Sequence, residues 1–216
     1  MNQTYMKEKK IFPLVMSMAL PMMLSMAFNS LYNIVDSYFV AKLSEDAMTA
    51  LSLVYPAQNL LTAVAVGFGV GVNAMISFYL GAQNQEKADK TATQGIVLGV
   101  LHGVLLMLLF LCGMNWFLGM FTKSDAVRAL GMEYSNVVFL FSVIVTGGIT
   151  LEKIFQAVGR MRATMVSMIA GFVTNIVLDP LLIFGIGPFP RMEIAGAALA
   201  TGIGQVITLL VYIIYY

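Results

Sequence analysis

Six long apolar segments, separated by short polar stretches, constrain the fold of this chain more than any other feature of its sequence. A helix needs about 20 mostly apolar residues to cross the hydrocarbon core of a bilayer, and each of the six segments is long enough. The segments cover residues 12–40, 49–80, 93–117, 132–157, 163–187 and 194–216. They predict an all-α integral membrane protein with six transmembrane helices.

The composition agrees with a protein that is surrounded by lipid. Of the 216 residues, 59% are hydrophobic and 11% are charged, whereas about 25% of the residues in soluble domains are charged. The net charge of +1 gives no indication of a nucleic-acid partner. Cys112 is the single cysteine, which excludes an intrachain disulfide and argues against a metal cluster. We therefore expect the bilayer as a partner and no cofactor.

The distribution of basic residues predicts the orientation in the membrane. With the N-terminus in the cytoplasm, eight basic residues fall inside and four outside, which the positive-inside rule favours. The inside set is Lys7, Lys9, Lys10, Lys87, Lys90, Lys153, Arg160 and Arg162, and the outside set is Lys42, Lys123, Arg128 and Arg191. Six spans return the C-terminus to the cytoplasm, and we expect the plasma (inner) membrane as the location. Glu152 and Lys153 are expected to snorkel at the inner interface.

Two carboxylates lie deep in apolar sequence, Asp36 in the first segment and Asp179 in the fifth. An ionisable group at the middle of a bilayer costs about 2.5–3.5 kcal/mol on insertion scales. Such residues usually bind a cation or carry a proton. The two aspartates are therefore the first candidates for a functional site.

Each aspartate has an amide close to it on the same helical face. Asn29 and Asn33 share a face with Asp36, flanked by Tyr32, because their spacings are four and three residues. Asn175 precedes Asp179 by four residues. One interpretation is a protonated acid hydrogen-bonded to its neighbouring asparagine. The repetition of the pattern favours a second interpretation, a site for Na⁺ or H⁺ built from oxygen ligands.

Prolines and small residues add two expectations about the helices. Pro21 lies inside the first segment and Pro180 directly follows Asp179, so both helices are expected to bend. A helix broken beside an acid is typical of a transporter binding site, although a packing kink explains the proline equally well. In the sixth segment, small residues predict a close-packing face: Gly196, Ala197, Ala200 and Gly204. Thr201 either adds a ligand to the site or bonds back to its own helix.

Several motifs of the chain occur together in one family of transporters. They are ALPMML near the start, NIVDSYFV at the end of the first segment, QAVGRMRATM before the fifth, NIVLDPLLIF, and MEIAGAALATGIGQ. In this order they resemble the multidrug and toxic compound extrusion (MATE) family over nearly the whole chain. Members of that family have twelve helices in two six-helix lobes. Residues 1–216 resemble the N-terminal lobe, and nothing in the sequence matches the C-terminal lobe.

The resemblance implies an antiporter, not an enzyme, that exports organic and often cationic drugs or toxic metabolites in exchange for Na⁺ or H⁺. The family's N-lobe cation site maps to Asp36, Asn175, Asp179 and Thr201. We expect ion binding to neutralise the acids, so that the first helix bends, at Pro21, and displaces the substrate. The expected partners are a small organic substrate and the C-terminal lobe, or a second half.

The sequence also bears on three other functions. A lipid-linked saccharide flippase of the same superfamily would need basic residues in a central cavity, and the first three segments contain none. An intramembrane aspartyl protease would carry YD and GxGD motifs, but the pairs here are VD and LD. A non-transporting half-length subunit remains open, because the chain stops where the sixth segment ends.

Overall fold

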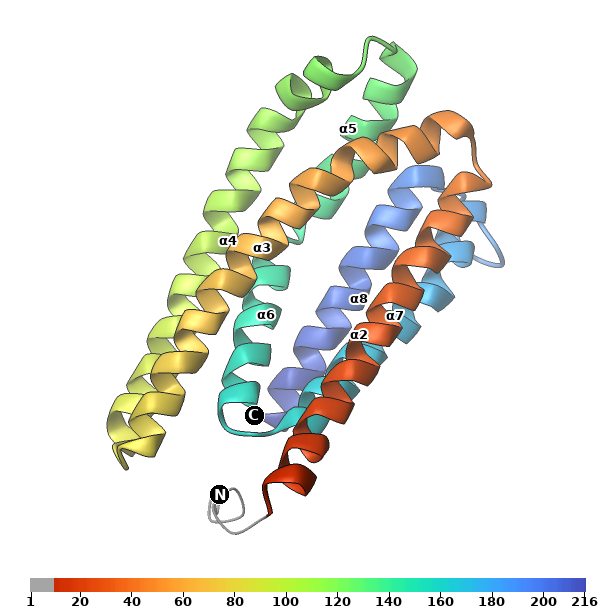
Figure 1. The fold of residues 1–216 in the computed structure, drawn as a ribbon. Helices are drawn as coiled ribbons and strands as arrows, with labels where there is room; N and C mark the ends of the chain where they lie inside the picture. The colour runs from red at the N-terminus through yellow and green to blue at the C-terminus, as the bar shows by residue number, and fades with distance from the viewer. Residues whose placement is uncertain (1–9) are drawn as a thin grey trace.

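The structure is a computed structural model that describes residues 10–216, and over those residues the chain is helical with no strand (Figure 1). The helices are α2 (Ile11–Ala41), α3 (Glu45–Gly81), α4 (Gln85–Phe121), α5 (Asp125–Leu140), α6 (Ser142–Ala157), α7 (Met161–Phe184) and α8 (Glu193–Tyr215). The prediction of an all-α protein is confirmed. Lys7 and Lys9, which contribute to the predicted orientation, lie outside the described residues.

Five of these helices are individually long and apolar enough to cross a membrane, and α5 and α6 together make a sixth span that is bent by 48°. The predicted fourth segment is thus two helices that meet at Phe141. There the backbone N–H of Phe141 bonds to Val138 O at 3.2 Å, and the Ser142 hydroxyl donates to Phe139 O at 2.6 Å. No proline marks this break, so the sequence did not predict it.

The helices extend beyond the apolar segments that predicted them. α3 and α4 have 37 residues each, about 55 Å of helix against a hydrocarbon core of about 30 Å. α4 starts inside the polar stretch that the sequence placed between two spans. The reason is side-chain capping, since Asn84 Oδ1 accepts the Lys87 N–H at 3.1 Å. Ser44 and Ser124 cap α3 and α5 in the same way.

The prolines do not interrupt their helices. Pro21 lies within α2, and α7 continues past Pro180 to Phe184. α7 is thus continuous beside Asp179, and the bends at Pro21 and Pro180 stay predictions. Within residues 10–216, the broken span is the one at Phe141, far along the chain from the aspartates.

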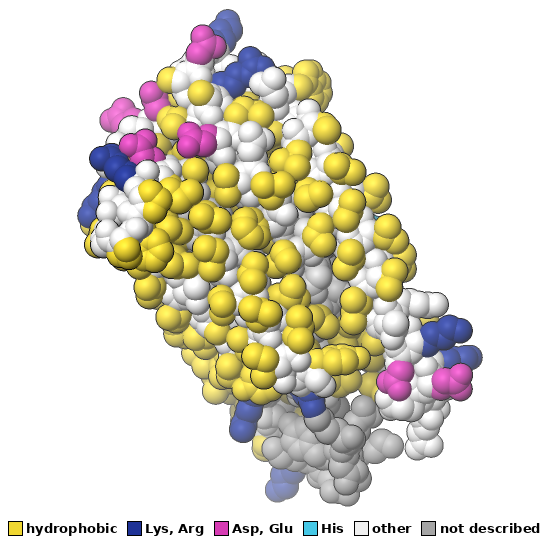
Figure 2. All heavy atoms as spheres, turned by 180° about the vertical axis from the view of Figure 1, so that it is seen from behind, with side chains coloured by type: hydrophobic (Ala, Val, Ile, Leu, Met, Phe, Trp, Pro, Cys, Tyr) yellow, Lys and Arg dark blue, Asp and Glu magenta, His cyan; other side chains and the backbone are white. Residues whose placement is uncertain are grey.

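The surface matches a multi-pass membrane protein. On the face shown in Figure 2, hydrophobic side chains cover a broad belt, and charged side chains gather at its two ends. Leu105, Trp116 and Ile214 are among the large apolar side chains that are exposed. The six spans alternate in direction, so that α2 begins and α8 ends at the same end of the molecule (Figure 1).

Small residues bring α7 and α8, the most extensively packed helix pair, into close contact. A Cβ atom at Gly196 would lie 2.7 Å from Leu182 O, and one at Gly204 would lie 2.8 Å from Gly171 O. The predicted close-packing face of α8 is thus confirmed. α2 packs mainly on α7, whereas α3 packs on α4 and α6 and makes few contacts with α2. This arrangement leaves a cavity between the two groups of helices.

Candidate functional site

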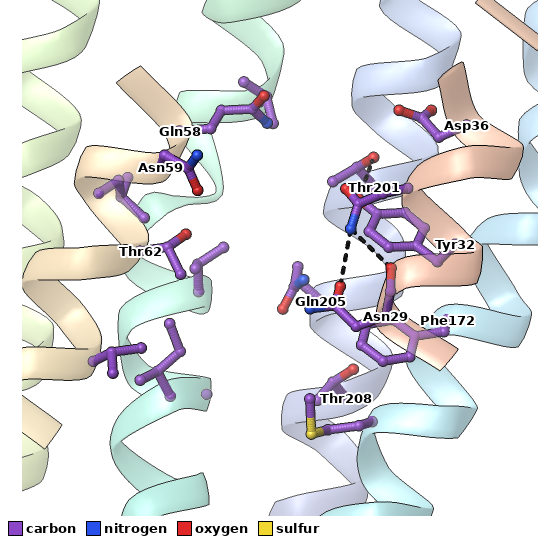
Figure 3. Close-up of a pocket in the computed structure, with 18 of the residues that line it drawn as sticks. Asn29, Tyr32, Asp36, Gln58, Asn59, Thr62, Phe172, Thr201, Gln205 and Thr208 are labelled. Atoms are coloured by element: carbon purple, nitrogen blue, oxygen red, sulfur yellow. Dashed lines mark hydrogen bonds between the residues drawn. The ribbon is translucent and has the colours of Figure 1, made fainter. Parts of the chain in front are cut away.

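The cavity has a volume of about 920 Å³ and receives side chains from α2, α3, α5, α6, α7 and α8. That volume lies in the range of pockets for drug-sized ligands. Polar side chains line both walls. Figure 3 shows Gln58, Asn59 and Thr62 of α3 on one side, opposite the wall formed by α2, α7 and α8. The polar residues labelled on that second wall are Asn29, Tyr32, Asp36, Thr201, Gln205 and Thr208.

The structure brings the predicted ligand residues of three helices together. The amide of Asn175 donates to Asp179 Oδ1 at 3.2 Å and lies 3.3 Å from Thr201 Oγ1. The Tyr32 hydroxyl lies 3.4 Å from the same threonine oxygen. Asp36 completes the group, because its carboxylate lies close enough to the Asp179 carboxylate and the Tyr32 hydroxyl to interact with both electrostatically. We call these five residues the aspartate cluster.

Three oxygens of the aspartate cluster are buried without a hydrogen-bond partner among the described residues: Asp36 Oδ1, Asn175 Oδ1 and Asp179 Oδ2. The Asp36 side chain is 6% exposed and Asp179 is fully buried. An unpaired acceptor in such a place carries the full cost of its desolvation. Together these oxygens form a set that accepts a proton or a hard cation.

The two aspartates differ in their access to the cavity. Asp36, Tyr32 and Thr201 are among the lining residues. Asp179 and Asn175 lie behind them, because neither belongs to the described lining and both are almost fully buried. A ligand in the cavity therefore meets Asp36 before it meets Asp179.

The predicted supporting residues of α2 only partly join this cluster. Asn29 and Asn33 line the cavity but are exposed, and the Asn33 amide donates to Asn29 O at 2.8 Å and to Asn29 Oδ1 at 3.2 Å. Asp36 takes no hydrogen bond from Asn33. The pairing of an amide with a carboxylate one turn away thus occurs on α7 and not on α2. Tyr32 is held by stacking on Phe172, with ring centroids 5.4 Å apart.

Thr201 does not bond back to its own helix within the described structure. Its hydroxyl is instead shared between Asn175 and Tyr32. This geometry suits a residue that adds an oxygen to the site, which was one of the two interpretations of its sequence position.

Residues on the opposite wall were not among the predicted site residues. Tyr134 is 2% exposed, lines the cavity and accepts the Gln58 amide at 3.4 Å. Its hydroxyl also interacts electrostatically with Asp36. Gln58 and Thr62 are four residues apart in an apolar segment, so they share one helical face. That spacing could have predicted a polar wall on this helix.

The expected interfacial position of Glu152 and Lys153 is wrong. Both side chains line the cavity, and they form an ion pair at 2.8 Å with only 16% and 14% of their surfaces exposed. The cavity thus contains a second charged group, far along the helices from the aspartate cluster.

Comparisons with known proteins place this fold. Over its full length the chain superposes on 47% of a solved MATE structure in the bent conformation, with a TM-score of 0.89 and 28% identity. An outward-facing multidrug resistance MATE family transporter of the MOP superfamily matches 94% of the chain with a TM-score of 0.88, 28% identity and 44% of its own length covered. The class is therefore a multi-pass membrane protein with the fold of one half of a MATE-type transporter.

The sequence comparisons identify the family. The model of the MatE family matches residues 21–181, and the chain belongs to this family. Multidrug export protein MepA of Staphylococcus aureus (strain NCTC 8325) is 32% identical over 213 residues, which cover 98% of this chain and 46% of MepA. The MepA of Staphylococcus haemolyticus is 30% identical over the same length. The chain thus spans about half the length of these relatives.

Proposed function

We propose that this chain is the N-terminal half of an exporter, and that it carries the site for a coupling cation. The exporter exchanges Na⁺ or H⁺ for organic, often cationic, drugs or toxic metabolites across the plasma (inner) membrane, with both ends of the chain in the cytoplasm. The observation that carries the proposal is the set of unpaired carboxylate oxygens of Asp36 and Asp179. Relatives named multidrug export proteins support the class of substrate.

The geometry supports coupling by charge. A proton or Na⁺ at the aspartate cluster partners Asp36 Oδ1 and Asp179 Oδ2 and removes the repulsion between the two acids. A ligand shifts a conformational equilibrium only through a difference in its affinity for the two states. Because Asp36 and Thr201 belong to both the cluster and the cavity wall, the ion changes the surface that the substrate contacts.

The remaining wall of the cavity suits varied apolar substrates. Met22 and Met26 of α2 and Met168 and Phe172 of α7 line it. Methionine is flexible and polarizable, so such a surface repacks around ligands of different shape. This supports export of several compounds instead of one.

A second lobe completes the transporter in this proposal. The relatives are about twice as long as the matched region, and alternating access needs two lobes that move against each other. We therefore infer that the C-terminal lobe, or a second half, closes the cavity.

The flippase alternative gains no support from the cavity. Lys153 is the only basic side chain among the described lining residues, and Glu152 neutralises it. A pyrophosphate group would need uncompensated positive charge. Nothing in the described structure favours this function over export of organic cations.

Transport in liposomes tests the proposal. This chain, joined to a second lobe, is reconstituted and given a sodium gradient and a proton gradient in separate experiments. We expect efflux of an organic cation to follow one gradient and to be lost in Asp36→Asn and in Asp179→Asn. Ser30→Ala, at an exposed position on α2 outside the cavity lining, is the matched control. Efflux at the wild-type rate in either aspartate variant would contradict the proposal. Efflux by this chain alone would show that a second lobe is not needed.

A further inference from the structure

The part of the cavity where α6 ends and α7 begins holds a second polar group. Glu152, Lys153 and Gln156 come from the last turns of α6, Thr164 from the start of α7 and Tyr212 from the end of α8. We call these five residues the glutamate cluster. On α8, Tyr212 is 11 residues from Thr201, which is about 16 Å along the helix axis. The glutamate cluster is therefore separate from the aspartate cluster.

The hydrogen bonds of the glutamate cluster leave one carboxylate oxygen free. Lys153 Nζ lies 2.8 Å from Glu152 Oε1 and 3.2 Å from Gln156 Oε1, and Gln156 Nε2 donates to Glu152 Oε1 at 2.7 Å. All the bonds to Glu152 go to Oε1, so Oε2 accepts none from the described residues. A carboxylate that is already neutralised still offers an acceptor toward the cavity.

Two further groups of this cluster are buried without a well-formed hydrogen bond. The Tyr212 hydroxyl interacts with Thr164, but neither oxygen makes a well-formed hydrogen bond with the described residues, and the two residues are 1% and 2% exposed. Both residues line the cavity, and the Tyr212 hydroxyl interacts electrostatically with Glu152. Buried polar atoms without partners cost free energy. A ligand that supplies both N–H groups and apolar surface would satisfy them.

α3 holds Lys153 at the cavity wall instead of releasing it to the interface. The Asn73 amide donates to Lys153 O at 2.8 Å. Gly69 leaves room for the lysine stem, since a Cβ atom there would lie 2.8 Å from Lys153 Cγ. Long lysine chains near helix ends ordinarily reach for water. The position of this lysine is therefore built into the packing of α3 and α6.

We propose that the glutamate cluster is a second subsite of the cavity that binds a protonated amine of the exported compound. The amine donates to Glu152 Oε2, with Tyr212 and Thr164 as neighbouring partners. Lys153 is the internal counter-cation, which keeps the carboxylate paired when no ligand is present and weakens its hold on the amine. This subsite deepens the proposed function, because it names the feature of the substrate that the cavity recognises.

The roles assigned to Glu152 and Lys153 predict effects of opposite sign. Removal of the carboxylate removes the acceptor, so the affinity for an amine falls. Removal of the lysine charge leaves the carboxylate uncompensated, so the affinity for an amine rises. An ion pair that only stabilises the fold would give changes of the same sign, because loss of either partner leaves a buried charge unpaired.

Binding to the purified full chain tests the subsite without any ion gradient. The probes are dansylcadaverine, whose chain ends in a protonated primary amine, and its N,N,N-trimethyl analogue, which has the same charge and no N–H at that end. Fluorescence titration measures both probes against Glu152→Gln, Lys153→Gln and the double variant. Thermal unfolding of each variant checks that it is folded.

We expect Glu152→Gln to weaken dansylcadaverine about tenfold, the loss of one charge-assisted hydrogen bond, and to weaken the trimethyl analogue less. Lys153→Gln should tighten dansylcadaverine several-fold. Shifts of the same sign in the two single variants, or unchanged affinity in both, would overturn the subsite. If Glu152→Gln does not fold, the affinity of Lys153→Gln for dansylcadaverine decides whether the subsite exists. A lysine with a purely structural role would not give tighter binding when it is removed. Failure of cation-driven efflux would overturn the proposed function and leave this result standing.

Discussion

The aspartate cluster and the glutamate cluster occupy the same cavity, but they balance charge in different ways. The aspartate cluster has two carboxylates and, among the described residues that line the cavity beside it, no basic side chain. The glutamate cluster has one carboxylate and its own lysine. Buried charges need a partner. In the proposed function the first cluster takes a cation or proton from outside the protein, whereas the second is neutral when it is empty.

This difference suggests separate roles in one transport cycle. A site that needs an external cation responds to an ion gradient, and a site with an internal cation responds to the substrate. The distance between them, about 16 Å along α8, is long enough for an ion and an amine to bind together. Variants that change the charge of one cluster at a time test whether the two clusters have separate roles.

The largest expected effect comes from Asp36→Asn compared with Glu152→Gln. Loss of the Asp36 charge should remove coupling between ion and substrate, roughly a 5–150-fold change for a typical coupled pair of sites. Cation-driven efflux from liposomes measures it. Glu152→Gln should lower substrate affinity and leave the dependence on the ion gradient in place. Equal loss of ion dependence in both variants would show that the clusters are not separate.

A smaller effect is expected from Asn175→Leu. This substitution removes the amide that bonds to Asp179 Oδ1 and lies beside Thr201 Oγ1. Leaving these buried acceptors without a donor costs about 1–3 kcal/mol, so both the thermal midpoint and cation-driven efflux should fall. Asn136→Leu is the matched control, because Asn136 is exposed and does not belong to the cavity lining. Equal losses in the two variants would contradict the assigned geometry.

The two clusters also differ in how well the sequence predicted them. Asp36 and Asp179 were found because a carboxylate in an apolar segment is costly, and the spacing of Asn175 placed its amide on the same face. Glu152 and Lys153 were misplaced because they lie near the end of a span, where charged residues usually reach the interface. What holds them at the cavity is the contact of Gly69 and Asn73 of α3 with α6, and a contact between distant segments leaves no local pattern.

The same limit applies to the fold. The six spans followed from apolar length, and the close approach of α7 and α8 followed from small residues. The break at Phe141 did not, because it lacks a proline, whereas α7 runs past Pro180 without a break. Membrane helices tolerate proline when neighbouring groups satisfy the freed carbonyls. Which neighbouring groups do this depends on the packing of the helices, which the sequence alone does not show.

The contact between Gly69 and Lys153 gives a third prediction, of moderate size. Gly69→Ala places a methyl group 2.8 Å from Lys153 Cγ, so the lysine stem must move away and its bond to Glu152 should weaken. We expect tighter binding of dansylcadaverine, in the same direction as Lys153→Gln but smaller. Gly71→Ala is the control, because nothing lies within 4 Å of a Cβ atom at that position. A change in Gly71→Ala as large as in Gly69→Ala would show that helix stiffness, and not the lysine, is responsible.

The smallest expected effect comes from Tyr212→Phe, which removes a buried hydroxyl that makes no well-formed hydrogen bond with the described residues. In the empty protein this should raise the thermal midpoint slightly, because an unpaired buried polar group costs about 1–3 kcal/mol and the ring itself is kept. With dansylcadaverine bound, the same substitution removes a partner of the amine, so the affinity should fall about two- to tenfold. Thermal unfolding with and without the probe measures both effects on one sample. The ring also packs against Phe155, with centroids 5.5 Å apart, and a purely structural tyrosine would respond identically in the two conditions. Opposite signs in the empty and the bound protein would therefore assign the hydroxyl to the ligand and distinguish the glutamate cluster from ordinary packing.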